Sequence, residues 1–306
     1  MTDTTAVRAG RHLRPRKRVV IPAMLAVAVL AIPAASTAAS AAATASTTSA
    51  THAVTPRAHA GSGTRGSHGP KPTVVLVHGA FADSSGWNGV ITRLVRDGYP
   101  VIAPADPLRD LTTDAAYISS VLDTIPGPVV LVGHSYGGEV ITNAAVGHAN
   151  VRALVYIAAF APEQGESALA LTGEFPGSQL GANILTRPFP TAEGGTGVDA
   201  YVDPAHFREV FAGDLPASTT RLMAATQRPV TLAALSTPSG VPAWKTIPSW
   251  YLVAGSDQAI PAAAERLMAK RAGARTVEIK GASHVVMISH PGRTADLITA
   301  AADATT

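Results

Sequence analysis

The chain has 306 residues, of which 46% are hydrophobic and 15% are charged, and it contains no cysteine. This composition excludes a disordered polymer, and the lack of cysteine excludes disulfides, thiolate metal ligands, iron–sulfur clusters and a cysteine nucleophile. Eight of the 24 basic residues but only one of the 21 acidic residues lie within 1–70, so 71–306, with 16 basic and 20 acidic residues, has a formal net charge of −4. The basic character belongs to the N-terminal segment, and we expect no nucleic-acid partner.

The N-terminal segment has the parts of a secretory signal peptide. Six of the first 18 residues are basic, an uncharged run follows over 19–35, and the stretch Ser-Thr-Ala at 36–38 places small side chains where a signal peptidase reads them. We predict a signal peptide over 1–38, a secreted, extracellular protein, and no stable membrane partner beyond export. An uncleaved membrane anchor is the less favoured alternative, because the apolar run is short for a bilayer span and contains two prolines.

Residues 39–70 consist mainly of Ala, Ser, Thr, Gly and Pro and show no hydrophobic period. Such a segment buries too little apolar surface to offset the entropy of ordering it. We therefore predict a disordered tether over 39–70, followed by a folded domain over 71–306.

The domain alternates between strand and helix patterns. Runs rich in β-branched and apolar residues predict strands at 73–77, 100–103, 128–132, 153–157, 250–253 and 275–279. Helices are predicted between and after them at 89–97, 111–123, 138–148, 262–272 and 292–302. Because the strand runs are continuous rather than alternating, we expect strands that are buried on both faces of a sheet. The order predicts an α/β fold with a mostly parallel, doubly wound sheet.

One interval, about 162–248, interrupts this alternation. It holds ten prolines and four of the six phenylalanines. A structureless loop of this length is unlikely in a compact domain. We predict an inserted lid subdomain with helices near 204–212 and 217–228, placed over the carboxyl ends of the strands, where such folds bind ligands.

One turn carries the residues of a serine nucleophile. The third predicted strand runs directly into Gly133-His134-Ser135-Tyr136-Gly137, and a predicted helix follows. The G-x-S-x-G pattern between a strand and a helix is typical of a sharp turn that holds the serine hydroxyl clear of the sheet. The helix N-terminus also favours negative charge at this point. We interpret Ser135 as a nucleophile rather than as part of a glycine-rich turn.

A serine nucleophile needs a base and an acid that orients the base, and the chain order for this motif is serine, acid, histidine. Asp257 follows the fifth predicted strand and His284 follows the sixth, so we predict a catalytic triad of Ser135, Asp257 and His284. Three alternatives remain: a helix-capping role for Asp257, Glu163 as the acid, and His290 as the base. Three further histidines are interpreted as structural or pocket-lining: His78, His134 and His206.

The oxyanion formed during acyl transfer needs backbone N–H donors near the serine. The loop after the first predicted strand, His78-Gly79-Ala80-Phe81, is in the position that supplies one of them. We predict an oxyanion hole made of the N–H groups of Ala80 and Tyr136, with Phe81 as a further candidate.

Together these segments resemble the α/β-hydrolase superfamily, and within it the small esterase-like branch near the plant methyl-ester esterases and hydroxynitrile lyases. The resemblance rests on 75–80 with Trp87, on 133–138, and on 283–287 with Pro291, and it covers about 71–302. It implies the α/β-hydrolase fold and a Ser-His-Asp hydrolase that uses no cofactor. The lid contains no motif from which the resemblance would imply a particular substrate.

The residues predict an enzyme, a secreted carboxylic-ester hydrolase acting on a small or medium-sized ester substrate. The alternatives are a hydroxynitrile-lyase-like or perhydrolase activity on the same scaffold, or a non-catalytic ligand-binding member of the fold. The resemblance implies a lysine after the histidine and a threonine beside the oxyanion loop in the plant lyases. Val285 and Gly79-Ala80 stand at those positions here, which favours hydrolysis.

We predict neither a metal ion nor a bound cofactor. The sequence has no H-E-x-x-H motif, and the first predicted strand is followed by His-Gly-Ala-Phe rather than by the glycine pattern of a dinucleotide site.

Overall fold

The computed structural model describes residues 70–192 and 194–305. The predicted signal peptide, and the predicted tether up to residue 69, lie outside these residues.

A six-stranded parallel sheet forms the centre of the domain, in the order β2-β1-β3-β4-β8-β9. Its strands are β1 (Thr73–Val77), β2 (Val101–Ile102), β3 (Val129–Ser135), β4 (Val151–Ala159), β8 (Ser249–Ala254) and β9 (Arg275–Ile279). All seven residues of β3 and all six of β8 are buried, as expected for strands covered on both faces. The predicted α/β fold with a mostly parallel sheet is confirmed.

The strand order changes direction beside β1. The chain passes from β1 outward to β2, and then crosses to β3 on the opposite side of β1. From there it continues through β4 and β8 to β9. In open α/β sheets, ligands bind outside the carboxyl ends of the strands at such a change of direction. The end of β3 therefore lies where this fold places its ligand site.

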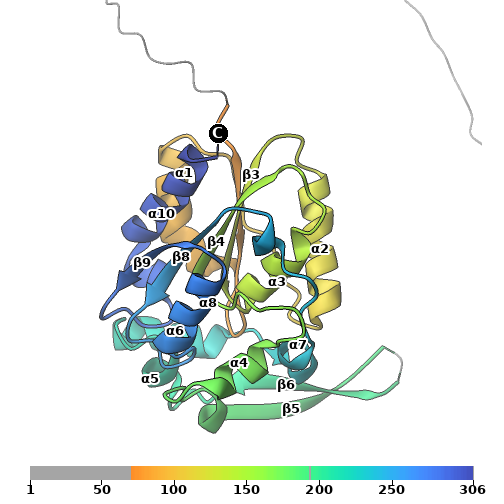
Figure 1. Cartoon of the computed structure of the whole chain (residues 1–306). Coiled ribbons are helices and arrows are strands. Elements are labelled where there is room, and N and C mark those ends of the chain that lie inside the picture. Colours follow the sequence, from red (N-terminus) through yellow and green to blue (C-terminus); the bar gives the residue numbers. More distant parts are fainter. Residues whose placement is uncertain (1–69, 193, 306) are drawn as a thin grey trace, which may run out of the picture. The chain divides into compact units, whose positions relative to one another are not determined.

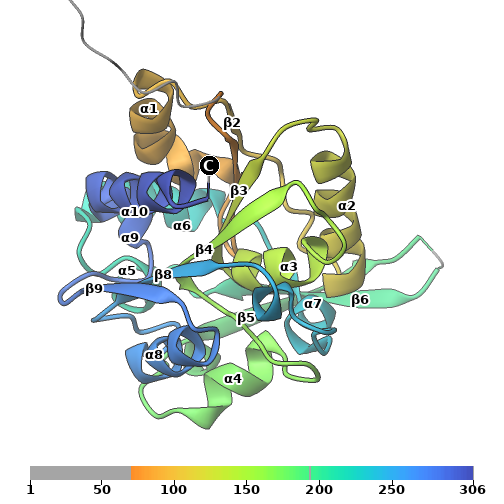
Figure 2. The same ribbon diagram turned by 45° about the horizontal axis from the view of Figure 1, so that its top comes forward.

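Helices cover both faces of the sheet. On one face α1 (Asn88–Arg96) packs with α10 (Pro291–Asp303), and on the other α2 (Leu111–Asp123) packs with α3 (Tyr136–Ala144) (Figures 1 and 2). The carboxylate of Asp110 begins α2 by accepting hydrogen bonds from the backbone N–H groups of the next turn. The connection from β8 to β9 is α8 (Ala262–Arg271), and a short α9 (Val286–Ser289) precedes α10.

Most of the chain between β4 and β8 lies at the carboxyl end of the sheet, at the bottom of Figure 1. We call residues 162–248 the lid. Its elements are α4 (Ala168–Glu174), β5 (Ile184–Pro190), β6 (Thr196–Val202), α5 (Phe207–Phe211), α6 (Ala217–Thr226), β7 (Val230–Thr231) and α7 (Leu232–Ser236), with two short 3-10 turns. The strands form a second, antiparallel sheet in the order β5-β6-β7.

Sequence patterns did not indicate this second sheet. Its strand β5 contains two prolines and is mostly exposed, so it has no buried face that would produce an alternating pattern.

No helix in the described ranges is long and apolar enough to cross a membrane.

Candidate active site

Ser135 occupies a strained turn between β3 and α3. Its φ is +54° and its ψ is −125°, a conformation that costs a residue with a side chain on the order of 1–3 kcal/mol. The turn is a single residue, so β3 ends at Ser135 and α3 begins at Tyr136 rather than at the predicted residue 138. This backbone carries the serine side chain beyond the end of β3, at the N-terminus of a helix.

The neighbouring glycines are required by close backbone contacts. A Cβ atom at Gly133 would lie 2.5 Å from the carbonyl oxygen of Gly137, and one at Gly137 would lie 2.6 Å from the carbonyl oxygen of His78. A Cβ atom at Gly79 would lie 2.6 Å from the Cβ atom of Ser135. The turn and the loop after β1 therefore pack directly against each other, and only glycine allows this approach.

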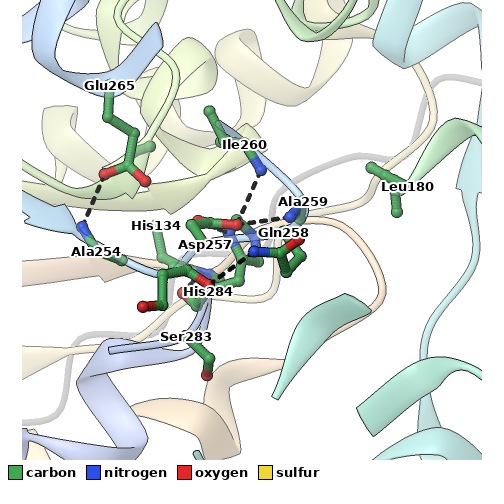
Figure 3. Close-up of polar contacts among 12 residues, drawn as sticks. His134, Leu180, Ala254, Asp257, Gln258, Ala259, Ile260, Glu265, Ser283 and His284 are labelled. Carbon is green, nitrogen blue, oxygen red and sulfur yellow. Dashed lines mark hydrogen bonds and ion pairs between the residues drawn. The ribbon is translucent and has the colours of Figure 1, made fainter. Parts of the chain in front are cut away.

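Asp257 and His284 form a buried pair at the ends of the neighbouring strands β8 and β9 (Figure 3). The Nδ1 atom of His284 lies 2.6 Å from Oδ2 of Asp257, and both side chains are almost fully buried. The other oxygen of Asp257 accepts hydrogen bonds from the backbone N–H groups of Ala259 and Ile260, at 2.7 and 2.9 Å. Three hydrogen bonds thus hold the carboxylate of Asp257 in place. It does not cap α8, whose N-cap is Pro261.

The opposite edge of the His284 ring faces a cavity. Its Nε2 atom is buried and has no hydrogen-bond partner among residues 70–192 and 194–305. Ser135 and His284 line the same cavity of about 80 Å³. With its Nδ1 proton held by Asp257, the ring presents a lone pair at Nε2, the atom that a general base uses. The structure therefore brings together all three predicted members of the triad.

The cavity is lined by the lid and by the ends of the strands, and its walls are apolar. Its polar lining residues are Ser135, Tyr136, Thr172 and His284, and no charged carboxylate, ammonium or guanidinium group of the described residues lines it. A larger cavity of about 210 Å³, lined by neither Ser135 nor His284, lies on the other side of Phe81. We take the smaller cavity as the candidate active site because it contains the reactive groups.

His78 fixes the loop that carries the predicted oxyanion donor. Its Nε2 atom accepts a hydrogen bond of 2.9 Å from the backbone N–H of Asp106, so the ring proton is on Nδ1. That proton is donated to the carbonyl oxygen of Gly79, at 3.0 Å. Because the C=O and the N–H of a trans peptide point in opposite directions, the N–H of Ala80 is turned away from His78. Burial lowers the pKa of His78, which keeps the ring neutral in this role.

The other oxyanion candidates differ in what the structure shows of them. Tyr136 is the first residue of α3, where backbone N–H groups have no partner within the helix. Its side chain points away and donates a hydrogen bond to Asp114, at 3.0 Å. Phe81 has a φ of +61°, and its ring packs edge-on against Phe211 of the lid. The assignment of Ala80, Phe81 and Tyr136 as donors stays a prediction.

The alternative acid, Glu163, and the alternative base, His290, form contacts with other residues. Glu163 is partly exposed and forms an ion pair of 2.5 Å with Lys245. The Nδ1 atom of His290 contacts the hydroxyl of Ser289 at 2.8 Å, and His206 is a half-exposed residue of the lid. Neither histidine lines the cavity that contains Ser135.

His134 supports the loop that carries His284. Its Nε2–H donates to the backbone carbonyl of His284 at 3.0 Å, and the two rings lie 4.7 Å apart. Complete burial, aided by the neighbouring His284, lowers the pKa of His134 well below its usual value. The ring is therefore neutral, and because it does not line the cavity that contains Ser135, it is not positioned to act as the base.

Sequence reasoning missed several buried acids around the site. Glu139 and Glu265 are completely buried on α3 and α8, and Asp106 is completely buried behind His78. For Glu265 a signal existed, because it shares its helix face with the buried Ala264, Met268 and Ala269. The described ranges contain no group of three side chains that could hold a metal ion.

Comparison with known proteins places the chain in a family. Residues 74–297 match the alpha/beta hydrolase family, and the chain belongs to it. This confirms the resemblance inferred from the three loops.

Two curated relatives have names that describe hydrolysis. The carbendazim hydrolyzing esterase of Nocardioides sp. (strain SG-4G) is 38% identical over 110 residues, which are 32% of this chain and 46% of that protein. The pyrethroid hydrolase of Sphingobium wenxiniae is 29% identical over 249 residues, covering 76% of this chain and 88% of that protein. These names support the classification of the chain as a carboxylic-ester hydrolase of this family.

Among solved structures, that of polyneuridine aldehyde esterase is similar with a TM-score of 0.65 and 19% identity. It covers 75% of this chain and 98% of the other. At this identity the likeness concerns the fold alone.

Proposed function

We propose that this chain is a secreted serine hydrolase that cleaves small to medium-sized carboxylic esters with Ser135, His284 and Asp257. One observation carries the proposal. The hydroxyl-bearing Ser135 and a buried His284, held at Nδ1 by Asp257, line the same apolar cavity.

The reaction follows from the positions of the protons. His284 Nε2 removes the proton from the Ser135 hydroxyl as its oxygen attacks the ester carbonyl carbon. The carbonyl oxygen becomes an oxyanion, and the N–H groups of Ala80 and Tyr136 donate hydrogen bonds to it. When the tetrahedral intermediate collapses, the imidazolium gives its proton to the leaving alcohol. Water then attacks the acyl-enzyme by the same route, which releases the acid and restores Ser135.

The walls of the cavity favour neutral, apolar acyl groups. A charged acyl group would lose its hydration without gaining a partner, because the lining offers no charged side chain from the described residues. The same feature argues against a hydroxynitrile-lyase reaction. A departing cyanide anion would benefit from a cation, and Val285, the residue after the catalytic histidine, is apolar and fully buried.

The test is hydrolysis of p-nitrophenyl acetate and butyrate by the full chain, beside Ser135→Ala and the exposed-helix control Ser120→Ala. We expect Ser135→Ala to lower kcat by at least about 10³-fold and the control to retain activity. A phosphonate ester should add its phosphonyl group to the wild type and the control but not to Ser135→Ala. A folded wild type that hydrolyses neither ester and takes up no phosphonyl group would reject the proposal.

Export is supported by the basic, apolar and small-residue sequence of 1–38. We expect an export-competent host to release the protein into the culture medium, with an N-terminus that begins directly after residue 38. Full-length protein retained with the cells would contradict this part of the proposal.

A further inference from the structure

Glu265 is a buried carboxyl group behind the acid of the triad. It extends from α8 and is 0% exposed. Its Oε2 atom accepts a hydrogen bond of 3.1 Å from the backbone N–H of Ala254, the last residue of β8. Its Oε1 atom is buried and finds no hydrogen-bond partner within the described part of the chain. In Figure 3 this second oxygen is on the side of the carboxyl group that faces Asp257.

The balance of the groups around Glu265 opposes a negative charge there. Asp257 faces it from the loop after β8, and the phenol of Tyr251 faces it from β8. The Ala254 N–H and the cation of Arg266 favour the charge, but the Arg266 side chain is exposed and bound to Glu278 of β9 at 2.7 and 2.9 Å. Burial first, and the charge of Asp257 second, raise the pKa of Glu265 well above its usual value. Burial and the charge of Asp257 therefore favour the protonated form of the Glu265 carboxyl group.

A neutral carboxylic acid carries an O–H that needs an acceptor. Asp257 is the nearby anion, and it already accepts hydrogen bonds from two backbone N–H groups and from His284. A carboxylate has about four lone-pair positions, so it can accept one more hydrogen bond.

We propose that Glu265 is a positioning residue that donates a hydrogen bond from its protonated carboxyl group to the Asp257 carboxylate. This inference rests on the proposed function, in which Asp257 orients the base. The added donor withdraws negative charge from Asp257, so the imidazolium of His284 is stabilised less. The imidazolium therefore gives up its proton more readily than it would beside Asp257 alone. Glu265 touches neither the substrate nor the reacting atoms.

The experiment compares Glu265→Gln with Glu265→Met. Glutamine keeps a neutral donor of the same length, whereas methionine keeps the length without a donor. Glu139→Met is the matched control, because Glu139 is equally buried, binds one backbone N–H at 3.2 Å and also has an unpaired Oε1, but it lies on α3. The readouts are the NMR titration of the His284 ring, the pH profile of kcat/KM, and the free energy of unfolding.

We expect Glu265→Gln to follow the wild type closely in the His284 titration and in the pH profile. Glu265→Met should move the His284 titration and the acid limb of kcat/KM upward by about 1 pH unit, because the loss of the donor leaves more negative charge on Asp257. At pH values below both midpoints its kcat/KM should therefore be about tenfold lower. Glu139→Met should lose stability but leave both pH midpoints in place.

Two results would overturn the inference: a Glu265→Met titration that coincides with the wild type, or an equal shift in Glu265→Gln and Glu265→Met. If Glu265→Met does not fold, the pH dependence of the free energy of unfolding of Glu265→Gln tests the inference instead. Its free energy of unfolding should then rise relative to the wild type as the pH increases, because only the wild type has an acid to ionise. A constant difference would contradict a protonated Glu265. The NMR titration and the unfolding experiment need no turnover, so they separate this inference from a failure of the proposed hydrolysis.

Discussion

Asp214 of the lid binds Ser283, the residue immediately before His284. Its carboxylate accepts one hydrogen bond from the Ser283 backbone N–H, at 3.1 Å, and another from the Ser283 hydroxyl. Burial opposes ionisation of Asp214, but the hydrogen bonds from Ser283 and Ser289 outweigh it and hold its pKa below the usual value. The lid therefore supports the loop of the base as well as covering the cavity.

Replacing Asp214 by asparagine should misplace the base. The amide can accept only one of the two hydrogen bonds well and loses the charge, and a charge-assisted hydrogen bond contributes about 1.5–3 kcal/mol. We expect kcat for p-nitrophenyl butyrate to fall about tenfold if about half of this energy serves to position His284. The control is Asp203→Asn, another lid acid, which accepts only the local N–H of Ala205. Equal activity in the two variants would show that Asp214 does not position His284.

Gly137→Ala should destabilise the domain. The added methyl group would lie 2.6 and 2.7 Å from the carbonyl oxygens of His78 and Val77, which are backbone atoms of the central sheet and its loop. Forcing atoms into a closely packed site costs typically about 1–3 kcal/mol, and we expect a loss at least this large in urea unfolding. Gly127→Ala is the control, since nothing lies within 4 Å of its Cβ position. An unchanged unfolding midpoint for Gly137→Ala would contradict the tight packing of the turn.

His78→Phe should impair the oxyanion hole without removing a donor. Phenylalanine retains a ring but cannot hold the Gly79 carbonyl, so the N–H of Ala80 loses its fixed direction. Deleting a whole oxyanion donor costs about 10²–10³ in kcat, and we expect a loosened donor to cost about tenfold, with KM little changed. His148→Phe is the control, because His148 contacts Ser119 away from the site. A change in KM alone would show that His78 affects substrate binding instead.

The sequence was sufficient to predict the parallel sheet and to select three residues that the structure brings together, Ser135, Asp257 and His284. Buried parallel strands require continuous apolar runs, as in β3 and β8, and Ser135 and Asp257 stand at or just beyond the ends of these two strands. Contacts between distant segments were not predictable in this way. Asp214 and Ser283 are 69 residues apart, and no local pattern relates them. The lid sheet was missed because β5 is exposed and proline-containing, so its pairing with β6 left no periodic signal.

The stability of the domain should depend on pH through Asp106. Burial, followed by the negative charge of Asp114, raises the pKa of Asp106 well above its usual value. Between about pH 4 and the folded-state pKa, the native state binds a proton that the unfolded state has released. This contribution therefore decreases as the pH rises, by up to about 1.4 kcal/mol per pH unit.

Asp106→Asn removes this titration. We expect its free energy of unfolding, relative to the wild type, to be higher at pH 8 than at pH 5. Urea unfolding at the two values measures the difference, and the exposed Asp296→Asn serves as the control. A difference that does not change with pH would mean that Asp106 is ionised in the folded protein.

Leu235→Trp should restrict the acyl group that the cavity accepts. Leu235 lies on α7 and lines the cavity beside Ser135, whereas its neighbour Ala233 is exposed on the same helix and does not line it. In a cavity of about 80 Å³, an indole ring competes directly with the far end of a longer acyl chain. Each buried CH₂ contributes about 0.8 kcal/mol, so excluding two of them should lower the ratio of kcat/KM for p-nitrophenyl hexanoate to that for the acetate by about tenfold. Ala233→Trp is the matched control and should keep the wild-type ratio. If Leu235→Trp also keeps it, the acyl chain of the substrate does not extend toward α7.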